Sequence, residues 1–162
     1  MKIIIMVVLS MVAMIAQSEE KSSMHDWRHD GSPAEKVSNL VQLVPGTSHW
    51  MAEMGARYQN LYWAAKQEKW DFAHYQLEEM ESLVHIVSRA RPGRAETAAV
   101  FLDKAIEPVE HALADEDWRK FEKAFSVLRA ECMACHAKND HSFIVLPEKP
   151  IWASSPVLNM TK

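Results

Sequence analysis

The sequence predicts an all-α fold, an antiparallel four-helix bundle, and three observations support this prediction. Apolar residues recur at three- and four-residue steps along four stretches of about twenty residues each. Short turn-forming segments separate the stretches, so consecutive helices would run antiparallel. Glycine is scarce, with 4 among 162 residues, and no stretch shows the alternation of apolar and polar residues that a strand requires.

The first predicted helix spans residues 48–67 and follows Pro45 and Gly46, which interrupt the preceding segment. Thr47 or Ser48 would cap its free N–H groups. At 1.5 Å per residue such a helix is about 30 Å long. Its inward-facing residues are predicted to be Met51, Met54, Tyr58, Leu61, Tyr62 and Ala65.

The second and third predicted helices span residues 70–90 and 94–114. Arg91-Pro92-Gly93 separates them, because proline disfavours helical geometry in the residue before it. Pro108 should kink the third helix by removing one backbone donor. The expected inward-facing residues are Ala73, Leu77, Met80, Val84 and Val87, followed by Ala98, Phe101, Leu102, Ala105, Ile106, Val109 and Leu113.

Asp115-Glu116-Asp117 turns the chain and can cap a fourth helix, which would end near Lys138. One face of that helix carries Phe121, Phe125, Leu128, Cys132, Cys135 and His136. The bundle therefore occupies residues 45–139. Residues 19–44 are polar and are predicted to form a loosely ordered arm, and residues 140–162, with three prolines, an extended tail.

The first residues have the pattern of a secretory signal peptide. Lys2 supplies the positive start, and the apolar run of residues 3–15 is too short to span a bilayer as a helix. Ala16-Gln17-Ser18 then provides small residues at the positions that a signal peptidase reads. An uncleaved membrane anchor is the alternative. The prediction is a signal peptide over residues 1–18 and export to the periplasm.

The net charge and the cysteines narrow the chemistry. The formal net charge is -4, and no basic patch or stripe suggests a nucleic-acid partner. The chain has 2 cysteines, three positions apart. In an oxidising compartment such a pair indicates a disulfide, a metal site, a redox dithiol or a cofactor attachment.

The segment Cys132-Met133-Ala134-Cys135-His136 has the C-x-x-C-H spacing of covalent haem attachment. Two thiols three residues apart lie on one face of a helix, where each can bond a vinyl-derived carbon on one edge of a porphyrin. The imidazole that follows can then bind the iron from the proximal side. We therefore predict one covalently attached haem c on Cys132 and Cys135, with His136 as the proximal axial ligand.

Two other interpretations of the cysteines are weaker. A thioredoxin-like dithiol needs a βαβ setting and a helix N-terminus, whereas this pair lies at the end of a long predicted helix. A structural zinc site needs two further ligands, and His141 is the one nearby candidate. A simple disulfide is the remaining alternative.

The second axial ligand is sought among 10 methionines and 8 histidines. In an antiparallel bundle the start of the first helix lies beside the end of the fourth, which carries the haem motif. Met51 and Met54 stand in the first turns of the first helix, on its inner face. Other candidates are His49, just before these turns, and His85 and His111, near the ends of the second and third helices.

Over residues 48–138 the pattern resembles the class II c-type cytochromes, which are four-helix bundles with C-x-x-C-H near the end of the last helix. In their low-spin relatives a methionine of the first helix, commonly in a Met-x-x-Met-Gly segment, binds the iron. Met51-Ala52-Glu53-Met54-Gly55 resembles that segment. The resemblance implies Met51 as the distal ligand, with Met54 as the second choice. Thr47 and Ser48 stand where the family often has an arginine.

These features predict an electron carrier with His/Met-ligated iron and a redox partner protein. The alternative is a five-coordinate, cytochrome c′-like protein that binds a diatomic gas such as NO or CO. A haem enzyme such as a peroxidase would need polar donors beside the iron. Tyr58 and Arg57 are the nearest candidates, but Arg57 lies off the inner stripe. No catalytic residue is therefore predicted.

Aromatic residues are expected to cluster around the turn between the first two helices. Helix packing is the simpler explanation. A homodimer surface on these two helices is the alternative, which the family resemblance makes plausible. The residues concerned are Trp50, Tyr62, Trp63, Trp70, Phe72 and Tyr75.

Overall fold

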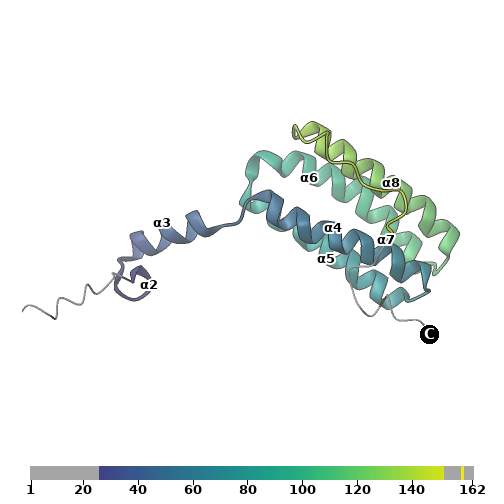
Figure 1. Cartoon of the computed structure of the whole chain (residues 1–162), viewed down its shortest axis with the longest axis horizontal. Coiled ribbons are helices and arrows are strands. Elements are labelled where there is room, and N and C mark those ends of the chain that lie inside the picture. The colour runs from purple at the N-terminus through teal and green to yellow at the C-terminus, as the bar shows by residue number, and fades with distance from the viewer. Residues whose placement is uncertain (1–25, 152–157, 159–162) are drawn as a thin grey trace, which may run out of the picture. The chain divides into compact units, whose positions relative to one another are not determined.

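A computed structural model describes residues 26–151 and Leu158, and the chain divides into two units between Leu43 and Val44 (Figure 1). All regular secondary structure among the described residues is helical, as the periodicity predicted. None of the helices in these residues has the length and apolar character needed to cross a bilayer. The predicted signal peptide, residues 1–18, lies outside the described part of the chain.

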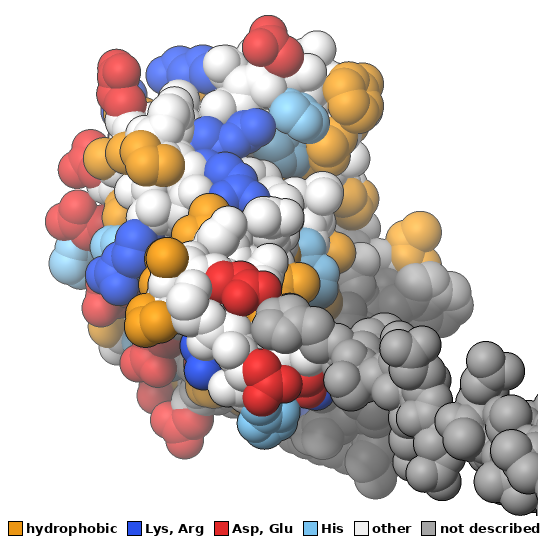
Figure 2. All heavy atoms as spheres, turned by 90° about the vertical axis from the view of Figure 1, so that its left-hand side faces the viewer, with side chains coloured by type: hydrophobic (Ala, Val, Ile, Leu, Met, Phe, Trp, Pro, Cys, Tyr) orange, Lys and Arg blue, Asp and Glu red, His pale blue; other side chains and the backbone are white. Residues whose placement is uncertain are grey.

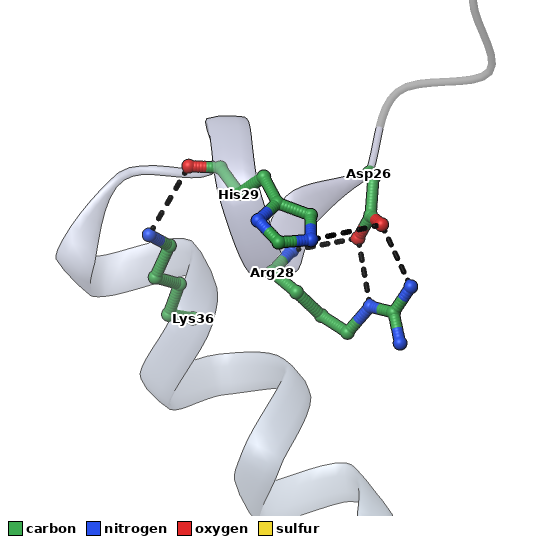
Figure 3. Close-up of polar contacts among 4 residues, drawn as sticks. All are labelled: Asp26, Arg28, His29 and Lys36. Carbon is green, nitrogen blue, oxygen red and sulfur yellow. Dashed lines mark hydrogen bonds and ion pairs between the residues drawn. The ribbon is translucent and has the colours of Figure 1, made fainter.

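The first unit contains helices α2, Trp27–Asp30, and α3, Pro33–Leu43. The expectation of a loosely ordered arm is therefore wrong for these residues. Asp26 caps α2 by accepting from the backbone N–H of Arg28 at 3.0 Å, and it also holds the Arg28 guanidinium (Figure 3). Pro33 suits the first position of α3, because the first N–H of a helix has no partner within it.

The second unit begins with α4, Thr47–Lys66, and α5, Trp70–Ala90. Both helices match their predicted spans to within a residue. The predicted cap of the first helix is wrong, because Gly46 is the N-cap and no side chain, of Thr47 or of Ser48, bonds the first free N–H groups. Arg91 ties the two helices together at this end, since its guanidinium donates to the Pro45 carbonyl at 2.7 Å.

The third predicted helix is a run of four segments. A 3-10 turn, η1, Pro92–Arg94, leads into α6, Ala95–Phe101, then a π-helical segment, η2, Leu102–Ile106, and α7, Glu107–Ala114. In the π segment Glu107 donates its N–H to the Leu102 carbonyl, five residues back. This π turn, which is wider than an α-helical turn, ends just before Pro108. Proline has no backbone N–H and so cannot donate a helical hydrogen bond.

The last helix is α8, Trp118–Lys138. Asp117 caps it as predicted, because its carboxylate accepts from the backbone N–H groups of Arg119 and Lys120. α4 packs mainly on α5, and α8 packs mainly on η2 and α7 (Figure 1). The predicted inward-facing residues of all four runs are buried, except that Met51, Leu102, Cys135 and His136 are half-buried.

Aromatic rings fill the interior between α4 and α8. Tyr58 stacks on Phe125 with ring centroids 4.5 Å apart, and Phe125 also contacts Tyr62 and Phe121. Offset and tilted ring pairs of this kind add about 0.5–1.5 kcal/mol each beyond the area they bury. Trp50 does not belong to the turn between the first two helices, contrary to the prediction, because Arg91 lies over its ring near the start of α4.

Residues 139–151 follow α8 without a further helix, as expected of a tail. This segment contacts the helices, however, and Leu146 packs against the core. Figure 2 shows the face on the left of Figure 1, where hydrophobic, basic, acidic and histidine side chains are intermixed.

Candidate functional site

A cavity of about 240 Å³ lies within the second unit and is lined mainly by apolar side chains. Every helical run of the unit contributes to its wall. Val84 and Val87 come from α5, and Ala98 and Phe101 from α6. A chamber with such a wall can hold an apolar group.

The three residues of the C-x-x-C-H motif line this cavity together. Cys132 is buried with 6% of its surface exposed, and Cys135 is half-buried. The two thiols are free rather than joined in a disulfide. α8 thus brings all three residues of the motif to the wall of one chamber.

The His136 imidazole is oriented by the chain that follows α8. Its Nδ1 lies 3.1 Å from the carbonyl oxygen of Ile144, so Nδ1 carries the proton that it donates there. In the neutral ring, Nε2 is then the unprotonated nitrogen, with a lone pair that can bind a metal ion. Histidines that bind metals commonly make this second hydrogen bond, which fixes the tautomer and raises the ligand basicity.

Met51 and Met54 of α4 line the same cavity as the motif. The predicted meeting of the start of the first long helix with the end of the last is therefore present. Gly55 also lines the cavity, and a Cβ added there would meet nothing within 4 Å. The space beside the α4 backbone is therefore open at this position.

The three histidines considered as other ligands do not line this cavity. His49, His85 and His111 are all exposed. His85 and His111 lie within 4 Å of glutamates one turn earlier on their own helices, Glu81 and Glu107. Met51 and Met54 thus share one cavity with the C-x-x-C-H motif, and these three imidazoles do not.

Tyr58 and Arg57 also differ in their relation to the cavity. Tyr58 lines it, and burial raises the pKa of its phenol well above the ordinary value. Arg57 does not line it, and its guanidinium instead pairs with Glu53 at 2.9 Å and lies 3.7 Å from Glu79. The prediction that Arg57 lies off the inner stripe is therefore confirmed.

Sequence reasoning missed several polar residues of the cavity wall. Asn139 donates to the Cys135 carbonyl at 2.8 Å and to the Thr97 hydroxyl at 3.2 Å, which joins the end of α8 to α6. Arg94 also lines the cavity, as does His141, which the sequence suggested only as a zinc ligand. The position of Asn139 directly after the last helical turn was the available signal, because residues there commonly satisfy free carbonyls.

The Cys132 thiol should react very slowly in the folded chain. Burial, with smaller contributions from Cys135 and Glu131, raises its pKa to about 12 from an ordinary value of 9.0. Because the thiolate is the nucleophile, alkylation at pH 8 should be roughly a thousandfold slower than in the urea-unfolded chain. Peptide mapping after iodoacetamide treatment measures this ratio, and equal rates in both states would contradict the buried placement.

Comparison of the chain with protein-family models, with curated proteins and with solved structures finds no match. No group of three or more His, Cys, Asp or Glu side chains placed to hold a metal ion occurs in the described part of the chain. The cavity and the residues that line it are therefore the basis for inferring a function.

Proposed function

We propose that this chain is an exported, periplasmic mono-haem c-type cytochrome that carries electrons, built as an antiparallel four-helix bundle of the class II kind. One observation carries the proposal. Two thiols, the imidazole of the same motif and two methionine thioethers line a single apolar cavity. The chemistry of these donors fits haem c, which needs two thiols on one edge and ligands from imidazole and thioether on the iron.

In this proposal Cys132 and Cys135 hold the porphyrin through thioether bonds. Each S–H would add across the C=C bond of one vinyl group, so that an S–C and a C–H bond would form and no oxidant would be required. His136 supplies the proximal ligand through Nε2. Met51 is the first choice for the distal ligand and Met54 the second. Haem iron, when bound, supplies a one-electron couple.

The surroundings of the cavity favour electron transfer. The apolar residues from α5 and α6 exclude water, and low local polarity raises the reduction potential. Ligation by histidine and methionine acts in the same direction, relative to two histidines. In this proposal the histidine and methionine ligands stay bound in both oxidation states, which limits the structural rearrangement that accompanies each electron transfer. The partner would be another redox protein, and a homodimer through α4 and α5 remains a prediction.

Visible and EPR spectra of the purified chain test this proposal and identify the ligand. The ferric protein should be low-spin with a methionine–iron charge-transfer band, and it should bind CO poorly when reduced. Met51→Ala should abolish the band, whereas Met54→Ala, one turn away in the same wall, should keep it. Loss of the band in Met54→Ala alone would assign the ligand to Met54.

A high-spin ferric spectrum with ready CO binding would reject electron transfer by a six-coordinate iron. It would support the alternative, a five-coordinate protein that binds NO or CO. The apolar wall around Met51 and Met54 would then limit which gases reach the iron.

A further inference from the structure

The segment after α8 is bound to α4 through its own backbone carbonyls. The Tyr58 hydroxyl donates to the Pro147 carbonyl at 2.8 Å, and the Trp63 indole N–H donates to the Pro150 carbonyl at 3.0 Å. Both donors lie on the same helix, one and a half turns apart. Further along the chain, Gln67 donates to the Leu158 carbonyl at 2.6 Å.

The same segment is bound to α8 from its other side. Nε of Arg129 donates to the Leu146 carbonyl at 2.8 Å, and His136 donates to the Ile144 carbonyl at 3.1 Å. From one end of the segment to the other, the residue numbers of its hydrogen-bond donors rise on α4 and fall on α8. It therefore runs parallel to α4 and antiparallel to α8, along the seam between them, and Figure 1 shows it in yellow beside α8.

The local sequence suits this course. Asp140 adopts a left-handed backbone with φ of 64°, and His141 donates its N–H to the His136 carbonyl at 2.8 Å, which reverses the chain directly after α8. Pro147 and Pro150 have no N–H, so they offer carbonyl acceptors without leaving a donor unpaired. The segment is held by side-chain donors rather than by a sheet.

This segment also forms one wall of the cavity, because His141, Ile144 and Leu146 line it. We propose that residues 141–150 are a strap that closes the cavity and holds the His136 imidazole with its proton on Nδ1 and Nε2 directed to the iron. Ile144 is a positioning residue that acts through its carbonyl. The consequence for iron rests on the proposed function, whereas the tautomer is a property of the chain alone.

Nitrogen-15 NMR of the His136 ring in the haem-free, reduced chain tests the strap directly. The full chain should show mainly the Nδ1–H tautomer. Truncation after Ser142 removes the Ile144 carbonyl, and the ratio of Nδ1–H to Nε2–H should fall roughly fivefold to tenfold, the usual worth of one hydrogen bond. Truncation after Ile151 is the matched control, because it keeps the carbonyls of residues 144–150, and it should leave the ratio unchanged.

A second variant applies if the shorter chain loses its helical circular dichroism. Trp63→Phe combined with Arg129→Gln keeps every strap residue and removes two of its donors, so the same fall in the ratio is expected. Arg119→Gln, on the same helix but away from the strap, controls for the lost charge. An unchanged His136 tautomer in a folded truncated chain, or in this double variant, would overturn the proposal.

The two proposals fail separately. If the chain acquires no haem but shows the expected change of tautomer, the cytochrome proposal is rejected and the strap proposal is supported. If it acquires haem and shows no change of tautomer, the strap proposal is rejected and the cytochrome proposal is supported.

Discussion

When both Cys132 and Cys135 are replaced with alanine, the protein should carry no covalent haem, even when it is produced in a host that attaches haem to c-type cytochromes. The reason is chemical, because these are the 2 cysteines of the whole sequence and no other side chain can form a thioether with a vinyl group. Each single variant should retain at most one bond to the porphyrin. Mass spectrometry of the denatured protein, together with its absorbance after solvent extraction, measures the attached haem.

Met133→Ala is the matched control for the cysteine variants. Met133 lies between the two cysteines, half-buried, and it is not part of the cavity wall. Its replacement should leave the haem attached in full. Covalent haem in the double cysteine variant would reject the proposed attachment, and complete loss in Met133→Ala would show that the assay reports folding instead.

Phe121→Ala should destabilise the protein by about 3–5 kcal/mol, a large part of the total free energy of unfolding. The ring of Phe121 is 0% exposed and contacts Trp118 and Phe125, with centroids 5.7 Å and 5.5 Å away. Removing it leaves a cavity that the surrounding helices can fill only in part. Urea unfolding, followed by circular dichroism in one fixed haem state, gives the difference.

Val127→Ala provides the comparison on the same helix. Val127 is 44% exposed, so its truncation should change the free energy of unfolding by less than about 0.5 kcal/mol. Equal losses in the two variants would indicate that the assay reflects helix propensity rather than burial. A small loss in Phe121→Ala alone would place the core elsewhere.

Periodicity alone predicted the long helices well, because each buries a stripe large enough to dominate its local pattern. Leu77 and Met80 illustrate this, since both were predicted to face inward and both are buried. The short helix α3 was missed, although Val37, Leu40 and Val41 have helical spacing, because no buried stripe distinguishes it from a polar arm. The N-cap of α4 was placed at Thr47 or Ser48 by residue type, whereas the backbone begins the helix after Gly46.

Some of the contacts around the cavity could also be predicted from the sequence, and others could not. The spacing of the motif and an antiparallel order of the helices were enough to predict that Met51, Met54 and His136 would lie close together, and all three line the cavity. Nothing in the sequence pattern predicted the contact between His136 and Ile144, because the acceptor is a backbone carbonyl, which every residue possesses. The prolines of the strap were identified, but a proline pattern shows that a segment is extended and not what binds it.

The π segment of the third helical run affects which side chains face the cavity. Phe101 faces the cavity and Leu113 the core, twelve positions later, and on an uninterrupted α-helix they would point about 120° apart. The wider turn at Leu102–Ile106 takes up one extra residue and removes about 100° of that difference. If the same residues formed an uninterrupted α-helix instead, Phe101 would rotate by about 100° relative to Leu113 and turn away from the chamber, although every lining side chain kept its identity. The backbone geometry of this helical run is therefore as much a part of the site as the chemistry of its side chains.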